Sequence, residues 1–192
     1  MLLPPVSGRT NSPPARLSVS GYGIFGNRQL KNILTVLQKP GARPRTFDAN
    51  FVEDAVLVLF SRINRDGFLY PKIHATVRFE DGHEETFTWT NPLGEPLPRP
   101  FPARHVEFKI EPGVLFYFEK INFAGVEAIP LKDAAHFFIQ TDVIIFRKQD
   151  RVYSPERLNS GMKSLQEALE RKGYESASVA TNNFLVNTNT GS

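Results

Sequence analysis

The chain has 192 residues, of which 41% are hydrophobic and 22% charged, and this composition is typical of one ordinary or two small folded domains. Cysteine is absent, which excludes disulfides, thiol nucleophiles and cysteine-ligated metals. The net charge is only +3 and the basic residues form no continuous run, so charge alone is weak evidence for binding of nucleic acid or acidic lipid.

The first third of the sequence predicts a leader, a strand and two helices. Residues 1–15 are rich in proline and serine and are expected to be disordered. The stretch RLSVSGYGIF, which begins at residue 16, is predicted to be a strand. Asn27 is expected to cap a helix over residues 28–38. Asp48 is expected to cap a second amphipathic helix that stops at Gly67, because glycine readily adopts the left-handed conformation past a last turn.

The middle of the chain predicts a β-hairpin and one more strand. Apolar residues alternate in KIHATVRF, Asp81-Gly82 is a strong hairpin turn, and EETFTWT is the return strand. The proline-rich stretch NPLGEPLPRPFPARH follows, and two interpretations stay open for it, an extended surface excursion and a polyproline ligand. A further alternating strand is predicted over residues 105–111.

The last part of the chain repeats this order of elements. FYFEKINFAG is predicted to be a strand, PLKDAAHFFI a short helix, and YESASVATNNFLV a final strand. Between the last two, a long helix is expected from the Ser154 cap to Gly173. Gly67 and Gly173 lie 106 residues apart, and Gly26 and Gly125 lie 99 apart. Similar spacings of this size predict two tandem modules.

The motifs for catalysis and cofactor binding are weak. Gly21, Gly23 and Gly26 spell the G-x-G-x-x-G pattern of a dinucleotide site, but a second helix follows where a second parallel strand is required. The four histidines show no metal-ligand spacing, and the carboxylates are scattered. We therefore expect no catalytic residue, no cofactor and no metal, and a nucleotide-binding enzyme remains only as a distant alternative.

A glycine-asparagine pair before the first helix and a glycine-aromatic pair after the second resemble the POTRA (polypeptide-transport-associated) domain. The resemblance extends over residues 17–192 and is to the periplasmic part of BamA/TamA-like outer-membrane assembly proteins of the surface antigen family. It implies an α+β fold of two β-α-α-β-β modules, each a three-stranded mixed sheet covered by two helices. The residues that carry it are Gly26, Asn27, Gly67, Phe68, VEFKIEPG at 106–113, Ile121, Gly125, Lys172, Gly173 and Tyr174.

The resemblance also implies domain boundaries. The first module would cover residues 16–112 and carry an inserted hairpin and proline-rich stretch at about 82–104. The second would cover residues 113–192 and lack its last strand. We therefore expect the second sheet to be incomplete, or to be completed by strand exchange between chains or by the leader.

The function implied by the resemblance is that of a periplasmic scaffold. Such a module would bind unfolded outer-membrane proteins or assembly-complex subunits, and no nucleic acid, by adding their strands to an open sheet edge. A C-terminal barrel would anchor the parent protein in the outer membrane. A two-partner secretion pore and a cell-division protein stay open as alternatives. The expected edge residues are Lys72, Ile73, His74, Ala75, Thr76, Val77, Arg78, Ser176, Ala177, Ser178 and Val179.

Overall fold

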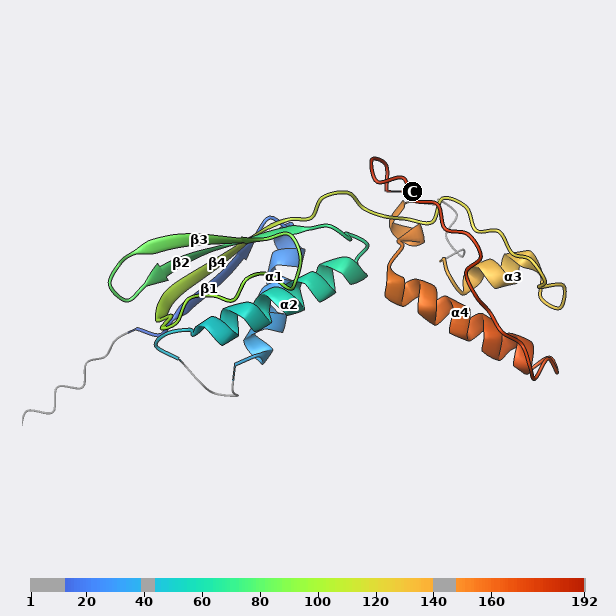
Figure 1. The fold of residues 1–192 in the computed structure, drawn as a ribbon, viewed down its shortest axis with the longest axis horizontal. Coiled ribbons are helices and arrows are strands. Elements are labelled where there is room, and N and C mark those ends of the chain that lie inside the picture. Colours follow the sequence, from blue (N-terminus) through green and yellow to red (C-terminus); the bar gives the residue numbers. More distant parts are fainter. Residues whose placement is uncertain (1–12, 39–43, 140–147, 192) are drawn as a thin grey trace, which may run out of the picture. The chain divides into compact units, whose positions relative to one another are not determined.

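The computed structural model describes residues 13–38, 44–139 and 148–191, and Figure 1 shows their fold. Most of the predicted leader lies outside these residues. The described residues form an α+β structure with four α-helices and one four-stranded mixed sheet. The chain divides into two compact units, which are described separately below: residues up to 56, 73–89 and 93–110 belong to the first, and residues 57–72, 90–92 and those from 111 onward belong to the second.

The first unit is built on the sheet, whose strand order is β1-β4-β2-β3. β1 runs parallel to β4, and β2 pairs with β3 as an antiparallel hairpin. Figure 1 shows α1 and α2 together on one side of this sheet. The elements up to residue 111 are β1 (Arg16–Ser20), α1 (Ile24–Val36), α2 (Ala49–Arg65), β2 (Lys72–Phe79), β3 (Glu84–Trp89) and β4 (Ala103–Glu111), and the part of α2 from residue 57 onward belongs to the second unit.

The two faces of the sheet differ in polarity because strand residues alternate between them. In β2, Ile73, Ala75 and Val77 are fully buried, whereas His74 and Thr76 lie on the opposite, partly exposed face. The central strand β4 is buried at every second position from Val106 to Ile110. One apolar face therefore forms the core under the helices, as the alternating sequence predicted.

Helix α1 begins earlier than the sequence predicted. Its first residue is Ile24, preceded by Gly23 at φ 74°, so Asn27 lies in the first turn and is not the cap. The Asn27 Oδ1 instead accepts a 2.8 Å hydrogen bond from the backbone N–H of Tyr22. A Cβ on Gly26 would lie 2.6 Å from Cδ1 of Tyr22. The glycine-asparagine pair thus holds Tyr22 against the start of the helix.

Helix α2 begins as predicted, because Asp48 Oδ1 accepts a 2.8 Å hydrogen bond from the N–H of Phe51.

Side chains of α2 also hold the proline-rich segment. The Glu53 carboxylate accepts from the N–H of Leu97 at 2.7 Å and from the Arg99 guanidinium at 2.8 Å. Leu97 is 5% exposed, so the segment is a fixed surface excursion, the first of the two interpretations.

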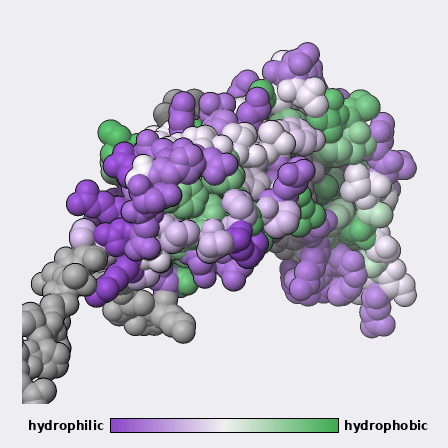
Figure 2. Space-filling view, turned by 60° about the vertical axis from the view of Figure 1, so that its left-hand side comes forward, coloured by the Kyte–Doolittle hydropathy of each residue, from purple (hydrophilic) through white to green (hydrophobic). Residues whose placement is uncertain are grey.

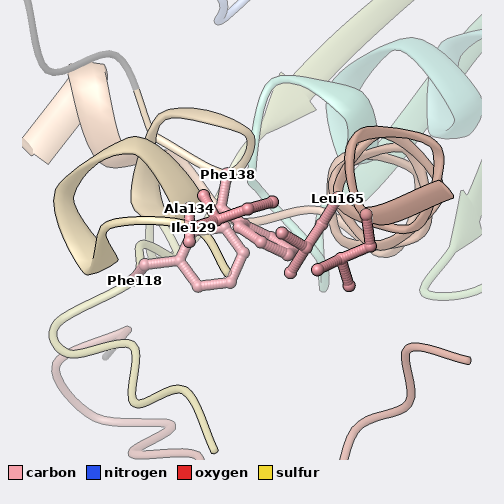
Figure 3. Close-up of a cluster of buried hydrophobic side chains, with 6 residues drawn as sticks. Phe118, Ile129, Ala134, Phe138 and Leu165 are labelled. Carbon is pink, nitrogen blue, oxygen red and sulfur yellow. The ribbon is translucent and has the colours of Figure 1, made fainter. Parts of the chain in front are cut away.

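Besides the end of α2, the second unit contains α3 (Leu131–His136), a 3-10 turn (Lys148–Arg151) and α4 (Pro155–Glu170). Ser154 caps α4 as predicted, with its Oγ accepting from the N–H of Arg157 at 3.1 Å. Figure 3 shows the core, in which side chains from α3 and the loops face Leu165 on α4. Its buried residues are Phe118, Ile129, Ala134, Phe138, Leu165 and Leu169.

The predicted sheet of the second module is not formed by the described residues of this unit. From residue 111 onward the described residues contain α3, the 3-10 turn, α4 and a single isolated bridge, between Tyr117 and Val152. Around it, the N–H of Phe118 donates to the Arg151 carbonyl at 2.8 Å, and the N–H of Tyr153 donates to the Phe116 carbonyl at 2.9 Å. The prediction that FYFEKINFAG and YESASVATNNFLV form strands is therefore wrong. A strand needs a neighbouring strand that pairs with its backbone, and these segments have none among the described residues.

None of the described helices is both long and apolar enough to span a membrane. Most of the surface visible in Figure 2 is hydrophilic, and hydrophobic residues gather there in separate patches.

Candidate polypeptide-binding strands

The turn after α2 places the chain at the start of β2. Gly67 has φ 93° and its N–H donates to the Asn64 carbonyl at 3.0 Å, while the N–H of Phe68 donates to the Ile63 carbonyl at 3.2 Å. This pair of bonds is the Schellman motif, which requires a left-handed residue at the glycine. Gly67 also packs closely, because a Cβ there would lie 2.6 Å from Cγ1 of Val152.

The turn after α4 has the same geometry. Gly173 has φ 94°, its N–H donates to the Glu170 carbonyl at 2.9 Å, and the N–H of Tyr174 donates to the Leu169 carbonyl at 3.2 Å. No atom lies within 4 Å of the position that a Cβ on Gly173 would occupy. The repeated glycine-aromatic motif therefore produces the same local turn twice, in different packing environments.

Strand β2 is not the open edge that the sequence analysis predicted. It lies between β4 and β3, and residues 73–78 pair with β3 over the whole hairpin. The reason is the Asp81-Gly82 turn, which returns the chain along the outer side of β2. The prediction that this strand is an open edge is therefore wrong. It concerned Lys72, Ile73, His74, Ala75, Thr76, Val77 and Arg78.

The open face of this hairpin is a ladder of polar pairs. His74 Nδ1 lies 2.9 Å from Thr88 Oγ1, and the Arg78 guanidinium donates to Glu84 Oε1 at 2.8 Å. Cross-strand pairs of this kind stabilise a sheet by about 0.2–1 kcal/mol each. These polar side chains thus join β2 to β3.

The described sheet has its two edges at β1 and β3. Phe87 and Trp89 of β3 pair with Ala75 and Ile73, which places them on the core face of the edge strand. The exposed half of β3 begins with Glu84 and Glu85, and such charges on an edge oppose pairing with another strand. The predicted hairpin already implied that its return strand would cover one side of β2.

The second predicted edge lies along α4. Ala177 and Val179 pack against the core cluster, whereas Ser176 and Ser178 are exposed, so the side chains alternate as in a strand. Further along, the Thr181 hydroxyl lies 3.5 Å from Sδ of Met162. The Phe184 ring lies 5.1 Å from the ring of Tyr153, which comes just before α4. These contacts place residues 177–184 antiparallel to α4.

The backbone of residues 178–186 makes no hydrogen bond to any other backbone group of the described chain. We call these residues the open segment. The chain is fixed on both sides of it, because the N–H of Ala177 donates to the Tyr174 carbonyl at 2.9 Å and the Gly191 carbonyl accepts from Tyr117 at 2.7 Å. The open segment is therefore anchored at both ends, and all of its residues except Val179, which is half-buried, are exposed.

One ionisable group beside the open segment is perturbed. Burial raises the pKa of Tyr153, and the neighbouring Tyr70 raises it further by repulsion between the two phenolates. The Tyr153 ring also packs edge-on against Phe118, with 5.2 Å between centroids. Neutral Tyr153 thus joins Phe184 of the open segment to the core.

The remaining predicted motif residues have structural roles or lie in turns. A Cβ on Gly21 would lie 2.0 Å from the Ile110 carbonyl oxygen, so close packing of β1 on β4 accounts for the first glycine of the G-x-G-x-x-G pattern. Gly125 has φ 71° and open space around it. Among the described residues there is no group of histidines and carboxylates that could hold a metal ion.

Comparison with known proteins identifies the region that contains the open segment. The family model described as "POTRA: Surface antigen variable number repeat" matches residues 116–190. This stretch includes the bridge at Tyr117, both helices α3 and α4, and the open segment. The comparison with curated proteins gives no match. A POTRA domain is therefore found at residues 116–190.

Proposed function

We propose that this chain is a periplasmic polypeptide-binding part of a BamA/TamA-like protein, and that the open segment accepts an extended strand of an unfolded outer-membrane protein. The observation that carries the proposal is the free backbone of residues 178–186, which lies extended within the POTRA match. An extended guest chain can satisfy these groups by β-augmentation. A module of this kind needs no cofactor and performs no catalysis.

The expected affinity is modest and depends little on sequence. Pairing along the open segment would form about four or five hydrogen bonds, each with a net contribution of about 0.5–1.5 kcal/mol. Part of this gain is lost when the guest chain is ordered. The binding free energy should therefore be weaker than about −8 kcal/mol, which corresponds to a dissociation constant above about 1 μM. Weak binding that depends little on sequence suits a protein that binds many different unfolded clients.

The proposal includes a second POTRA-like module in tandem, at residues 16–112. Its order of β1, α1, α2 and β2 and its glycine-aromatic turn follow the same plan, and β4 enters between β1 and β2. Strand β3 is an addition to the three-stranded POTRA sheet that the resemblance implies. It pairs with the side of β2 that would otherwise be an open edge. In this proposal the two modules differ in role, since each described strand of the first pairs with a neighbouring strand, whereas the open segment of the second has no backbone partner among the described residues.

An NMR titration tests the proposal. The ¹⁵N-labelled chain is mixed with a peptide from a transmembrane strand of an outer-membrane protein, and shifts are expected in the open segment. Because successive N–H groups of an extended chain point to opposite edges, only one of the exposed-site variants Ala180→Pro and Asn183→Pro should abolish the shifts. Glu175→Pro is the matched control, since residue 175 is the second residue of the Tyr174–Ala177 turn, where proline is tolerated.

Two outcomes would contradict the proposal. Shifts confined to β1 or β3 would move the binding site to the first unit. Shifts in the open segment that survive both proline variants would show that the peptide contacts side chains and does not pair with the backbone.

A further inference from the structure

Helix α1 exposes large apolar side chains on the face that does not cover the sheet. Ile24 is 87% exposed, Phe25 is 89% exposed and Val36 is 82% exposed, whereas Leu30 and Leu34 are buried. With 100° between successive residues, the three exposed side chains fall on one side of the helix. Ile24 and Val36 lie about 18 Å apart along its axis. Burial of these side chains elsewhere would stabilise the bound state.

The same face is basic. Arg28 and Lys31 are exposed on it, between the apolar ends, and α1 contains no acidic residue. Within the part of the chain that the structure describes, neither Arg28 nor Lys31 forms an ion pair. Their charges are therefore available to an external anion.

The basic character extends beyond the helix. The first 47 residues contain seven basic residues and no acidic one, and the remaining 145 contain 16 basic and 20 acidic residues. The net charge of +3 is therefore the sum of a strongly basic N-terminal part and an acidic remainder. The seven basic residues are Arg9, Arg16, Arg28, Lys31, Lys39, Arg43 and Arg45.

We propose that the exposed face of α1 binds the surface of an anionic phospholipid bilayer, with Ile24 and Phe25 entering the headgroup region. Apolar side chains beside unpaired cations, with no acidic residue, are the features of helices that lie in a membrane interface. A nucleic acid would satisfy the cations but would not bury the aliphatic Ile24 and Val36. This contact does not depend on binding of polypeptides by the open segment.

The size of the effect follows from the two kinds of contact. Moving one large apolar side chain into the interface contributes about a factor of ten in binding, so Ile24→Ser with Phe25→Ser should weaken it about a hundredfold. Each cation near an anionic surface contributes about a factor of five, so Arg28→Gln with Lys31→Gln should weaken it about twenty-fivefold. Neither pair reaches the core, so both variants should fold normally.

Co-sedimentation of the full chain with lipid vesicles tests the proposal. Vesicles of phosphatidylglycerol and phosphatidylcholine should bind the protein, and vesicles of phosphatidylcholine alone should bind it much less. Leu93→Ser is the control for the apolar pair because Leu93 is 86% exposed outside α1, and Lys172→Gln is the control for charge. Both controls should bind like the unaltered protein.

A second measurement locates the contact. In Phe25→Trp the new indole should be quenched by lipids brominated on their acyl chains, whereas the native Trp89, which is 6% exposed, should not. Equal binding to neutral and anionic vesicles, or unchanged binding after removal of Ile24 and Phe25, would overturn the proposal. Stronger binding to duplex DNA than to anionic vesicles, lost with Arg28 and Lys31 alone, would instead assign the face to nucleic acid.

Discussion

Gly67 and Gly173 allow the effect of packing to be measured separately from the effect of backbone conformation. Both residues have φ above 90° in the same hydrogen-bonded turn. A Cβ on Gly67 would meet Val152 at 2.6 Å and Leu115 at 3.0 Å, whereas a Cβ on Gly173 would meet nothing within 4 Å. The substitutions Gly67→Ala and Gly173→Ala therefore impose a similar backbone strain with and without a steric clash.

The expected magnitudes follow directly. An L-residue in the left-handed conformation costs about 1–2 kcal/mol, and this should be the whole effect of Gly173→Ala. Overpacking adds about 1–3 kcal/mol, so Gly67→Ala should destabilise by about 2–5 kcal/mol. The clash also pushes residues 115 and 116 away, which weakens the 2.8 Å hydrogen bond from the Phe116 N–H to the Gly67 carbonyl.

Urea unfolding followed by circular dichroism, with hydrogen exchange of individual amides, measures both effects. Exchange of the Phe116 and Phe68 amides should accelerate strongly in Gly67→Ala, and exchange of the Tyr174 amide should accelerate less in Gly173→Ala. Equal losses of stability in the two variants would refute the reasoning, because the crowding around Gly67 would then contribute nothing.

Three further predictions concern single side chains. Asn27→Ala should lower the free energy of unfolding by about 1 kcal/mol, since the N–H of Tyr22 loses its acceptor, and thermal unfolding monitored by tryptophan fluorescence measures this loss. Glu53→Gln should change stability by at most about 1 kcal/mol, because its partner Arg99 is half exposed, but limited proteolysis should cut residues 90–102 faster. Because the pKa of Tyr153 is raised above 10.0 in the folded state, its stabilising effect is fully present below pH 10.0 and is lost as the pH rises through the folded pKa. Urea unfolding at neutral and strongly alkaline pH should therefore show a smaller loss of stability in Tyr153→Phe than in the unaltered protein.

Local features of the fold could be predicted from the sequence because local interactions determine them. Asp48 and Ser154 cap helices as expected, and Gly67 and Gly173 end helices in the left-handed conformation that glycine favours. The position of Asn27 was predicted wrongly, because an asparagine side chain near a helix start can accept from a residue outside the helix as well as from one inside it.

The pairing of strands was harder to predict. The Asp81-Gly82 turn indicated β3, but which side of β2 remains free depends on where β4 enters the sheet, a contact between distant parts of the chain. The alternation of Ala177 and Val179 correctly indicated an extended chain with one packed face. Alternation describes the side chains alone and carries no information on whether a neighbouring strand is present to pair with the backbone.

The two units differ in whether their extended segments are paired with a neighbouring strand. An edge strand exposes unpaired backbone groups that attract any extended chain, so a fold must cover such an edge or use it. The first unit covers the outer side of β2 with β3, whose exposed end carries Glu84 and Glu85. In the second unit, side-chain contacts with α4 hold the open segment extended before any guest arrives, which reduces the entropy lost on pairing. Disrupting those contacts, for example with Val179→Ser, should therefore weaken peptide binding although no atom that pairs with the guest is changed. If the NMR titration gave the same affinity for Val179→Ser as for the unaltered chain, preorganisation of this segment by α4 would have no part in binding.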